Sequence, residues 1–247
     1  MTRRIHVIGI GAGDPDYVTV QAVTALNDTR VFFAMDKGDT KDDLVALRRL
    51  ICERFIREPG YRFHEMPDPP RAKGGDYRQA VADWHAERAR LWADAITSEL
   101  GPGDVGAFLA WGDPSLYDST LRILDRVAEH VDIDYDVIPG ITAIQALTAR
   151  HRIPLNDVGE PVLITTGRQL RASGLAGSAV VMLDADCSFQ GCPPDTRIWW
   201  GAYLGTADEL LFSGTVGDVG AHIVTARAAA RAEHGWIMDT YLLRGPE

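Results

Sequence analysis

The chain has 247 residues, a net charge of −10 and an isoelectric point of about 5.1. This length suffices for one large domain or two small ones, each with its own apolar core. The acidic balance argues against a nucleic-acid binder that acts through a basic surface, although a local arginine cluster can still bind an anionic small molecule.

The sequence also bears on location and metal binding. No apolar stretch approaches the roughly 18 residues that a membrane span needs. The N-terminal residues hold no apolar signal-peptide core followed by a cleavage site. The three cysteines, Cys52, Cys187 and Cys192, lack the spacing of a disulfide framework or a zinc site. We therefore expect a cytoplasmic protein with no metal ion and no membrane contact.

Up to about residue 150, short β-branched apolar runs alternate with amphipathic stretches. This alternation is typical of a mainly parallel sheet covered by helices. Thr19 stands where its hydroxyl can cap the first of these helices. The predicted strands span residues 5–10, 31–35, 105–110 and 135–138, and the predicted helices span 19–26, 42–57, 76–100, 116–131 and 141–150.

One stretch interrupts this alternation. Residues 59–75 contain four prolines and three glycines, which favour a loop or a separately structured insertion. Together with the long helix that follows, we interpret residues 59–100 as an inserted loop-helix segment.

The second half of the chain has a different pattern. Residues 153–161 have the composition of a linker. Strand candidates then follow closely, at 162–165, 179–183, 197–204, 210–215 and 236–243. The sequence thus predicts two α/β domains, residues 1–155 and 156–247, of which the second is richer in strand pairs.

The first predicted strand ends in a glycine-rich loop, GIGAGDP, with glycines at Gly9, Gly11 and Gly13. A dinucleotide-binding fingerprint would need a third glycine at position 14 or 16, where Asp14 and Asp16 stand instead. The spacing therefore disfavours an NAD-dependent oxidoreductase. A ligand loop and a plain strand–helix turn both remain open at this segment.

Similar loops follow two more predicted strands, WGDPSLYD at 111–118 and IPGITAIQAL at 138–147. Ligands of open α/β sheets bind at the carboxyl ends of the strands, where all three loops lie. With FSGTVGDV at 212–219, these motifs resemble in order and spacing those of the S-adenosylmethionine-dependent tetrapyrrole methyltransferases. The resemblance covers essentially the whole chain.

Two features make the chain similar to one branch of that family, which methylates C1 of a precorrin and removes its acetyl group. Ala12 stands where most relatives carry proline, and residues 65–89 are longer than the corresponding connection in relatives. The resemblance implies a class III fold of two α/β domains with the cofactor cleft between them, and a homodimer. It further implies methylation of precorrin-5 at C1, with acetate as a second product.

The resemblance also implies which residues bind the methyl donor, S-adenosylmethionine, and its product S-adenosylhomocysteine. For Asp113 the alternative role is a helix cap, and for Leu183 and Leu204 it is plain core packing. The amino end of the helix that begins near 141 also suits an anion. The implied donor-binding residues are Ala12, Trp111, Gly112, Asp113, Leu116, Thr142, Ala143, Leu183, Leu204 and Thr240.

Loss of the acetyl group requires water to attack a carbonyl, which calls for a general base near neutral pKa. His85 is the first candidate, since Tyr77, Arg78, His85 and Arg88 can share one face of a helix. A solvated helix face is the alternative interpretation. Tyr77 on the same face is a further catalytic candidate, and Asp16 and His64 are weaker candidates for the base.

The substrate's many carboxylates call for arginine anchors, because guanidinium matches carboxylate in bidentate geometry. Arg71 and Lys73 lie in a segment that could close over the macrocycle or could equally be exposed on a loose loop. In the first loop, Gly11 and Gly13 would let the macrocycle approach, and Asp14 or Asp16 would make a polar contact. The candidate substrate-binding residues are Gly11, Gly13, Asp14, Arg71, Arg78 and Arg88.

Other functions fit the same fold. A methyltransferase of this fold could act on another tetrapyrrole or on a protein side chain, and a non-catalytic module could keep the S-adenosylmethionine site. Binding of S-adenosylhomocysteine without NAD would separate these from an oxidoreductase. Turnover of a precorrin with acetate release would separate the deacetylating enzyme from the rest.

Overall fold

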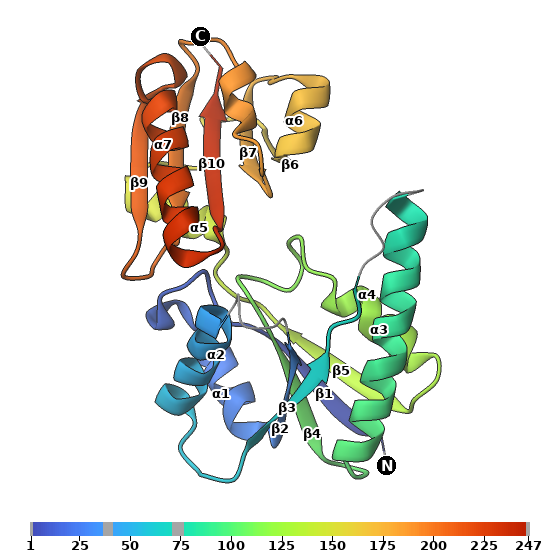
Figure 1. The fold of residues 1–247 in the computed structure, drawn as a ribbon. Coiled ribbons are helices and arrows are strands. Elements are labelled where there is room, and N and C mark those ends of the chain that lie inside the picture. Colours follow the sequence, from blue (N-terminus) through green and yellow to red (C-terminus); the bar gives the residue numbers. More distant parts are fainter. Residues whose placement is uncertain (1, 37–41, 71–76, 246–247) are drawn as a thin grey trace. The chain divides into compact units, whose positions relative to one another are not determined.

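A computed structural model describes residues 2–36, 42–70 and 77–245 of the chain (Figure 1). The chain divides into two compact units. The first unit comprises Met1–Gly11 with Pro15–Ile141, and the second comprises Ala12–Asp14 with Thr142–Glu247.

The first unit is built on a five-stranded sheet in the order β3-β2-β4-β1-β5. All strand pairs of its described residues are parallel, which confirms the predicted parallel α/β layer. The strands are β1 (Arg3–Gly9), β2 (Val31–Asp36), β3 (Arg62–Pro67), β4 (Val105–Ala110) and β5 (Ile133–Ile138). Its helices are the 3₁₀ turn η1 (Pro15–Tyr17), α1 (Val20–Asp28), α2 (Asp42–Phe55), α3 (Tyr77–Glu99) and α4 (Thr120–Ala128).

Helices cover both faces of this sheet (Figure 1). Because side chains alternate along a strand, β1 sends Val7 toward α3 and α4 and Ile8 toward α1 and α2. Trp92 of α3 stacks on Phe108 of β4, with ring centroids 4.1 Å apart. Fully burying one large apolar side chain contributes about 1.5–3 kcal/mol, so these two cores hold the sheet rigid beneath the loops at its carboxyl edge. Thr19 caps α1 as predicted, since its hydroxyl accepts the Ala22 N–H at 3.1 Å.

The proline-rich stretch contains a strand that the sequence did not indicate. β3 is the edge strand of the sheet and pairs with β2, so residues 62–67 belong to the main fold. The Phe63 ring lies 5.4 Å from that of Phe32, and Met66 is buried. The prediction of a loop was wrong for residues 62–67, because the prolines that indicated it flank β3 or, in the case of Pro67, end this edge strand.

The helix predicted at 116–131 also begins later than expected. α4 starts at Thr120, because residues 116–118 belong to the preceding loop. The Asp118 carboxylate accepts the Thr120 N–H at 2.6 Å and thereby ends that loop.

The second unit has a mixed sheet in the order β6-β7-β10-β8-β9. Among the strand pairs of the described residues, β6 with β7 is parallel and the other three pairs are antiparallel, in contrast to the first sheet. The strands are β6 (Val162–Thr166), β7 (Ser178–Met182), β8 (Arg197–Ala202), β9 (Leu210–Thr215) and β10 (Asp239–Arg244). The helices are α5 (Ala143–His151), α6 (Gly167–Ser173), the 3₁₀ turn η3 (Ser188–Gly191) and α7 (Val216–His234).

The division between the units falls after Ile141, earlier than the boundary expected at 155. The difference arises because α5 packs on β8 and β10 of the second sheet. Leu147 of α5 is fully buried, and the His151 ring N–H donates to the Trp200 carbonyl over 3.0 Å. Within the described residues, no helix has the length and apolar character needed to cross a membrane.

Candidate functional site

The loops that follow β1, β4 and β5 meet through their backbones. Gly11 and Gly112 form a two-residue bridge, with N···O distances of 3.3 and 2.8 Å. The Gly140 N–H donates to the Asp113 carboxylate at 2.9 Å. A Cβ atom at Gly140 would lie 2.0 Å from the Gly112 carbonyl oxygen, a contact that no side chain permits. The sequence therefore placed these three loops together correctly.

The glycines of the first loop serve the protein's own packing. Gly11 has φ +82°, and a Cβ there would lie 2.7 Å from that of Tyr17. Gly13 has φ +153°, and a Cβ there would lie 2.2 Å from the Leu204 carbonyl oxygen. Ala12 between them is buried. The absence of a side chain at Gly11 and Gly13 is thus explained by the packing of the protein itself, and their contact with a macrocycle stays a prediction.

The two aspartates of this loop differ in exposure. Asp14 is half-buried, whereas Asp16 is exposed on η1. The Asp16 carboxylate forms an ion pair with Arg54 of α2. A substrate or water molecule would have to displace Arg54 from this carboxylate, and the catalytic role of Asp16 stays a prediction.

Asp113 ties the second loop to the third. One of its carboxylate oxygens accepts the N–H and hydroxyl of Ser115 at 2.8 and 2.5 Å, and the other accepts the Gly140 N–H. Burial tends to raise the pKa of Asp113, but these hydrogen bonds outweigh burial and hold the pKa below its ordinary value. Asp113 is thus an ionised carboxylate that links two loops by hydrogen bonds, and it does not cap α4. Its neighbours Trp111 and Leu116 are half-buried, and Gly112 is buried.

Thr142 opens α5 with a capping box. Its hydroxyl accepts the Ile144 N–H at 3.1 Å, and its own N–H donates to the Gln145 side chain at 3.1 Å. An anion bound at this helix end, beside Ala143, would compete with the Gln145 oxygen for the Thr142 N–H.

The three late positions implied by the resemblance have different environments. Leu183 follows β7 with φ +52° and is 68% exposed, so core packing does not explain it. Leu204 is buried against Gly201. Thr240 is buried, and its hydroxyl donates to the Val181 carbonyl at 3.1 Å. The side chains of Leu204 and Thr240 therefore serve the fold, and only that of Leu183 is presented to solvent.

A buried polar network, which no sequence motif indicates, lies beneath Leu183. The Asp184 carboxylate accepts the Tyr241 hydroxyl at 2.6 Å, and the N–H and hydroxyl of Ser188 at 2.5 and 2.7 Å. Burial tends to raise the pKa of Asp184, yet these donors outweigh it and the pKa is lowered. The network fixes the turn that holds Leu183 outward.

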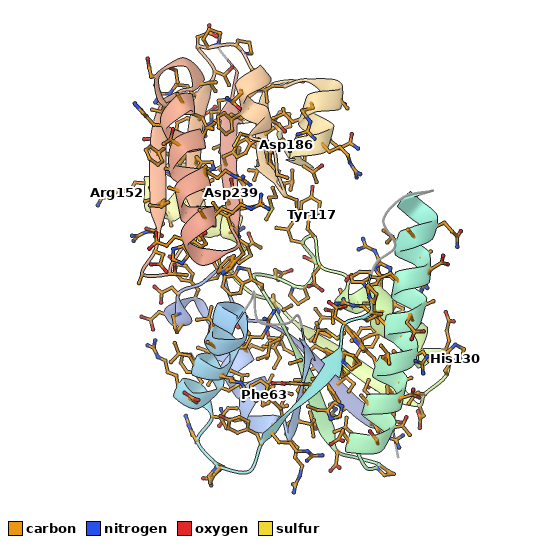
Figure 2. All side chains as sticks on the ribbon, in the orientation of Figure 1. Phe63, Tyr117, His130, Arg152, Asp186 and Asp239 are labelled. Carbon is orange, nitrogen blue, oxygen red and sulfur yellow. The ribbon has the colours of Figure 1, made fainter. Side chains whose placement is uncertain are left out.

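A buried arginine extends this network. Arg227 of α7 donates to the Asp184 carbonyl at 2.8 Å and pairs with Asp239 of β10 at 2.9 Å. The Trp200 indole N–H also donates to Asp239, at 3.0 Å. Figure 2 shows Asp239 inside the second unit. No local motif marks Arg227 or Asp239 in the sequence, and their roles become apparent only once their contact is known.

The predicted base lies in a basic environment. His85 is 9% exposed on α3, with its ring centroid 5.3 Å from that of Trp84. Burial, followed by the positive charges of Arg126, Arg122 and Arg88, lowers the pKa of His85 below 6.5. The imidazole is therefore neutral at pH 7 and has a nitrogen able to accept a proton. A solvated helix face does not describe this residue.

Arg88 is adjacent to His85 but is not an exposed anchor. Its guanidinium donates to Asp68 at 2.9 Å and lies 4.0 Å from the Trp84 ring centroid. Arg88 is buried and its charge is paired with that of Asp68. A substrate carboxylate would have to compete with Asp68 for this guanidinium, and the role of Arg88 as an anchor stays a prediction. His64 of β3 pairs with Glu99 at 3.3 Å.

The remaining candidates, for substrate binding and, in the case of Tyr77, for catalysis, lie wholly or partly outside the described residues. Arg71 and Lys73 fall in the undescribed range 71–76. Tyr77 and Arg78 begin α3, but their side chains are not described. Arg122 and Arg126 of α4 are basic groups near His85 that the sequence analysis did not select.

Comparison with known proteins identifies the family. The family model of the tetrapyrrole (corrin/porphyrin) methylases matches residues 4–220. The chain belongs to this family. It is 50% identical over 98% of its length, and 95% of the relative's, to a Sinorhizobium protein named precorrin-6A synthase [deacetylating].

Solved structures of tetrapyrrole methylases and related proteins have the same fold. A putative cobalamin synthesis related protein (CobF) from Corynebacterium diphtheriae is 42% identical, with a TM-score of 0.87 and full coverage of both chains. Uroporphyrin-III C-methyltransferase from Thermus thermophilus, solved with S-adenosyl homocysteine, is 17% identical, with a TM-score of 0.63 over 98% of this chain and 92% of that one. The two-sheet α/β architecture is thus that of the tetrapyrrole methylases.

Proposed function

We propose that the protein transfers a methyl group from S-adenosylmethionine to C1 of precorrin-5 and releases the acetyl group as acetate, giving precorrin-6A. The observation that carries this proposal is the 50% identity, over 98% of the chain, to the relative named precorrin-6A synthase [deacetylating]. The three loops that contact one another at the carboxyl edge of the first sheet also support the proposal, because open α/β folds bind their ligands at this edge.

The residues present fit the methyl donor. The amino end of α5 at Thr142 and Ala143 suits the carboxylate of its methionine part, and the exposed Leu183 suits the apolar surface of its adenosyl part. When bound, the donor supplies an electrophilic methyl group on sulfur. The chain's own contribution is placement, because in-line alignment of nucleophile and methyl provides most of the acceleration.

His85 is proposed as the base of the deacetylation. Its neutral imidazole takes a proton from water as the oxygen bonds to the acetyl carbon. The carbon–carbon bond to the macrocycle then breaks, acetate leaves, and the electron pair stays on the macrocycle. The charges of Arg122 and Arg126 favour the oxyanion formed at the carbonyl.

Replacing His85 tests this role. We expect His85→Gln to lower the rate of acetate release by about 10²-fold or more, the usual contribution of a general base, while S-adenosylhomocysteine affinity is unchanged. Because the His85 pKa is lowered, the wild-type rate should persist below pH 6.5 and fall only as the imidazole becomes protonated. A variant with the wild-type rate would contradict the role.

The reaction itself is tested by stoichiometry. With precorrin-5 and S-adenosylmethionine, we expect equal amounts of S-adenosylhomocysteine and acetate. Methyl transfer without acetate would indicate another tetrapyrrole substrate, and donor binding without any transfer would indicate a binding module. We also propose that the protein is a cytoplasmic homodimer. Its molar mass in solution, measured by light scattering, tests the dimer.

A further inference from the structure

Tyr117, in the loop after β4, has an uncommon backbone conformation. Its φ is +51°, a left-handed value that is costly for a large side chain and natural for glycine. The residue is also 45% exposed. Figure 2 shows its ring at the outer end of the loop, pointing away from the first sheet.

The contacts on either side of Tyr117 maintain this conformation. Asp113 fastens the start of the loop to Gly140. At its end, the Asp118 carboxylate accepts the Thr120 N–H, and the Asp118 carbonyl accepts a guanidinium N–H of Arg122 at 3.2 Å. Backbone strain of this kind persists only where surrounding contacts fix it, and it concentrates at ligand sites.

We propose that Tyr117 is a substrate-binding residue whose ring packs against the tetrapyrrole macrocycle. This inference rests on the proposed function. An aromatic ring suits a broad, partly apolar ligand face, and its phenol can stay hydrated at the rim.

The exposure of the loop residues favours the macrocycle, rather than the methyl donor, as the ligand that Tyr117 contacts. Gly112 is buried, and Asp113 and Leu116 are half-buried, while Tyr117 is exposed. The residues that the resemblance relates to the donor thus lie at the base of the loop. Tyr117, which is more exposed than these residues, can therefore contact the larger ligand, the macrocycle.

A second strained residue provides a matched control. Arg152 also has a left-handed φ, +54°, and is exposed, but it ends α5, where its N–H bonds to the Ala149 carbonyl at 3.1 Å. Its conformation is therefore explained by helix termination. Arg152→Gly relieves the same kind of strain outside the candidate site.

The test compares Tyr117→Gly, Tyr117→Phe and Arg152→Gly by thermal unfolding, precorrin-5 kinetics and S-adenosylhomocysteine binding. Both glycine variants should unfold no lower than the wild type. Tyr117→Gly should raise the KM for precorrin-5 by about tenfold, equivalent to one lost aromatic contact, with donor-product affinity within about twofold. Tyr117→Phe and Arg152→Gly should keep the wild-type KM.

Three results would overturn the inference. These are a wild-type KM in Tyr117→Gly, a loss of S-adenosylhomocysteine affinity as large as the KM change, or a lowered unfolding temperature in Tyr117→Gly alone. A wild type that fails to convert precorrin-5 removes the proposed function and this inference with it. If the wild type converts precorrin-5 and Tyr117→Gly has the same KM, the inference about Tyr117 is refuted and the proposed function stands.

Discussion

The two units hold the turns that follow their strands in different ways. In the first unit, Gly11, Gly112 and Gly140 bring three loops into backbone contact, and Asp113 fastens them. In the second, the buried carboxylate of Asp184 fixes the turn after β7 through side-chain donors. Backbone contact leaves no room for any side chain, whereas a polar network depends on charge and hydrogen bonding. Different kinds of substitution should therefore destabilise the two regions.

The largest effect is expected in the first unit. Gly140→Ala would bring a Cβ to 2.0 Å from the Gly112 carbonyl, so at least about 3 kcal/mol of unfolding free energy should be lost. Gly191→Ala is the control, because a Cβ there meets nothing within 4 Å. Urea unfolding measures both, and hydrogen exchange should locate the loss in the first sheet. Equal midpoints for the two variants would refute the backbone-contact account.

A smaller loss is expected in the second unit. Asp184→Asn turns an amide N–H₂ toward groups that donate to Asp184, which should cost roughly 2–3 kcal/mol. Tyr241→Phe removes one donor only and should cost about 1 kcal/mol. In both variants, amide hydrogen exchange should become faster in the second sheet, while the amides of the first sheet stay protected. Exchange that rises first around β1 and β4 would contradict the comparison.

The smallest effect is an acid sensitivity confined to the second unit. Because the pKa of Asp184 is lowered in the folded protein, its stabilisation is fully present above the ordinary value of 3.8 and is lost as pH falls through the lowered pKa. Unfolding midpoints of the wild type should therefore fall in acid more steeply than those of Asp184→Asn. Parallel pH dependences would show that Asp184 does not contribute.

The sequence predicted the parts of the fold that local patterns encode. The parallel layer, the Thr19 cap and the grouping of three loops followed from apolar runs and turn residues next to strand ends. β3 was missed because the prolines and glycines around it indicate a loop unless the neighbouring strand is known. α5 was assigned to the wrong unit because its sequence does not show which sheet it packs on.

The site was harder to predict, because its contacts join residues far apart in the chain. The role of Gly13 depends on the Leu204 carbonyl, and that of Arg88 depends on Asp68. The network at Asp184 draws on β10 and α7, so no local motif marks it. The strain at Tyr117 is a backbone angle, which an aromatic residue in a sequence does not indicate.

The most direct test of the account is to follow a labelled methyl group. The enzyme would be incubated with precorrin-5 and S-adenosylmethionine carrying a ¹³C methyl group, and the products examined by NMR. We predict that the label appears on C1 of the macrocycle and that unlabelled acetate is released with it. Label on another ring carbon, or a product that keeps its acetyl group, would contradict the proposed function.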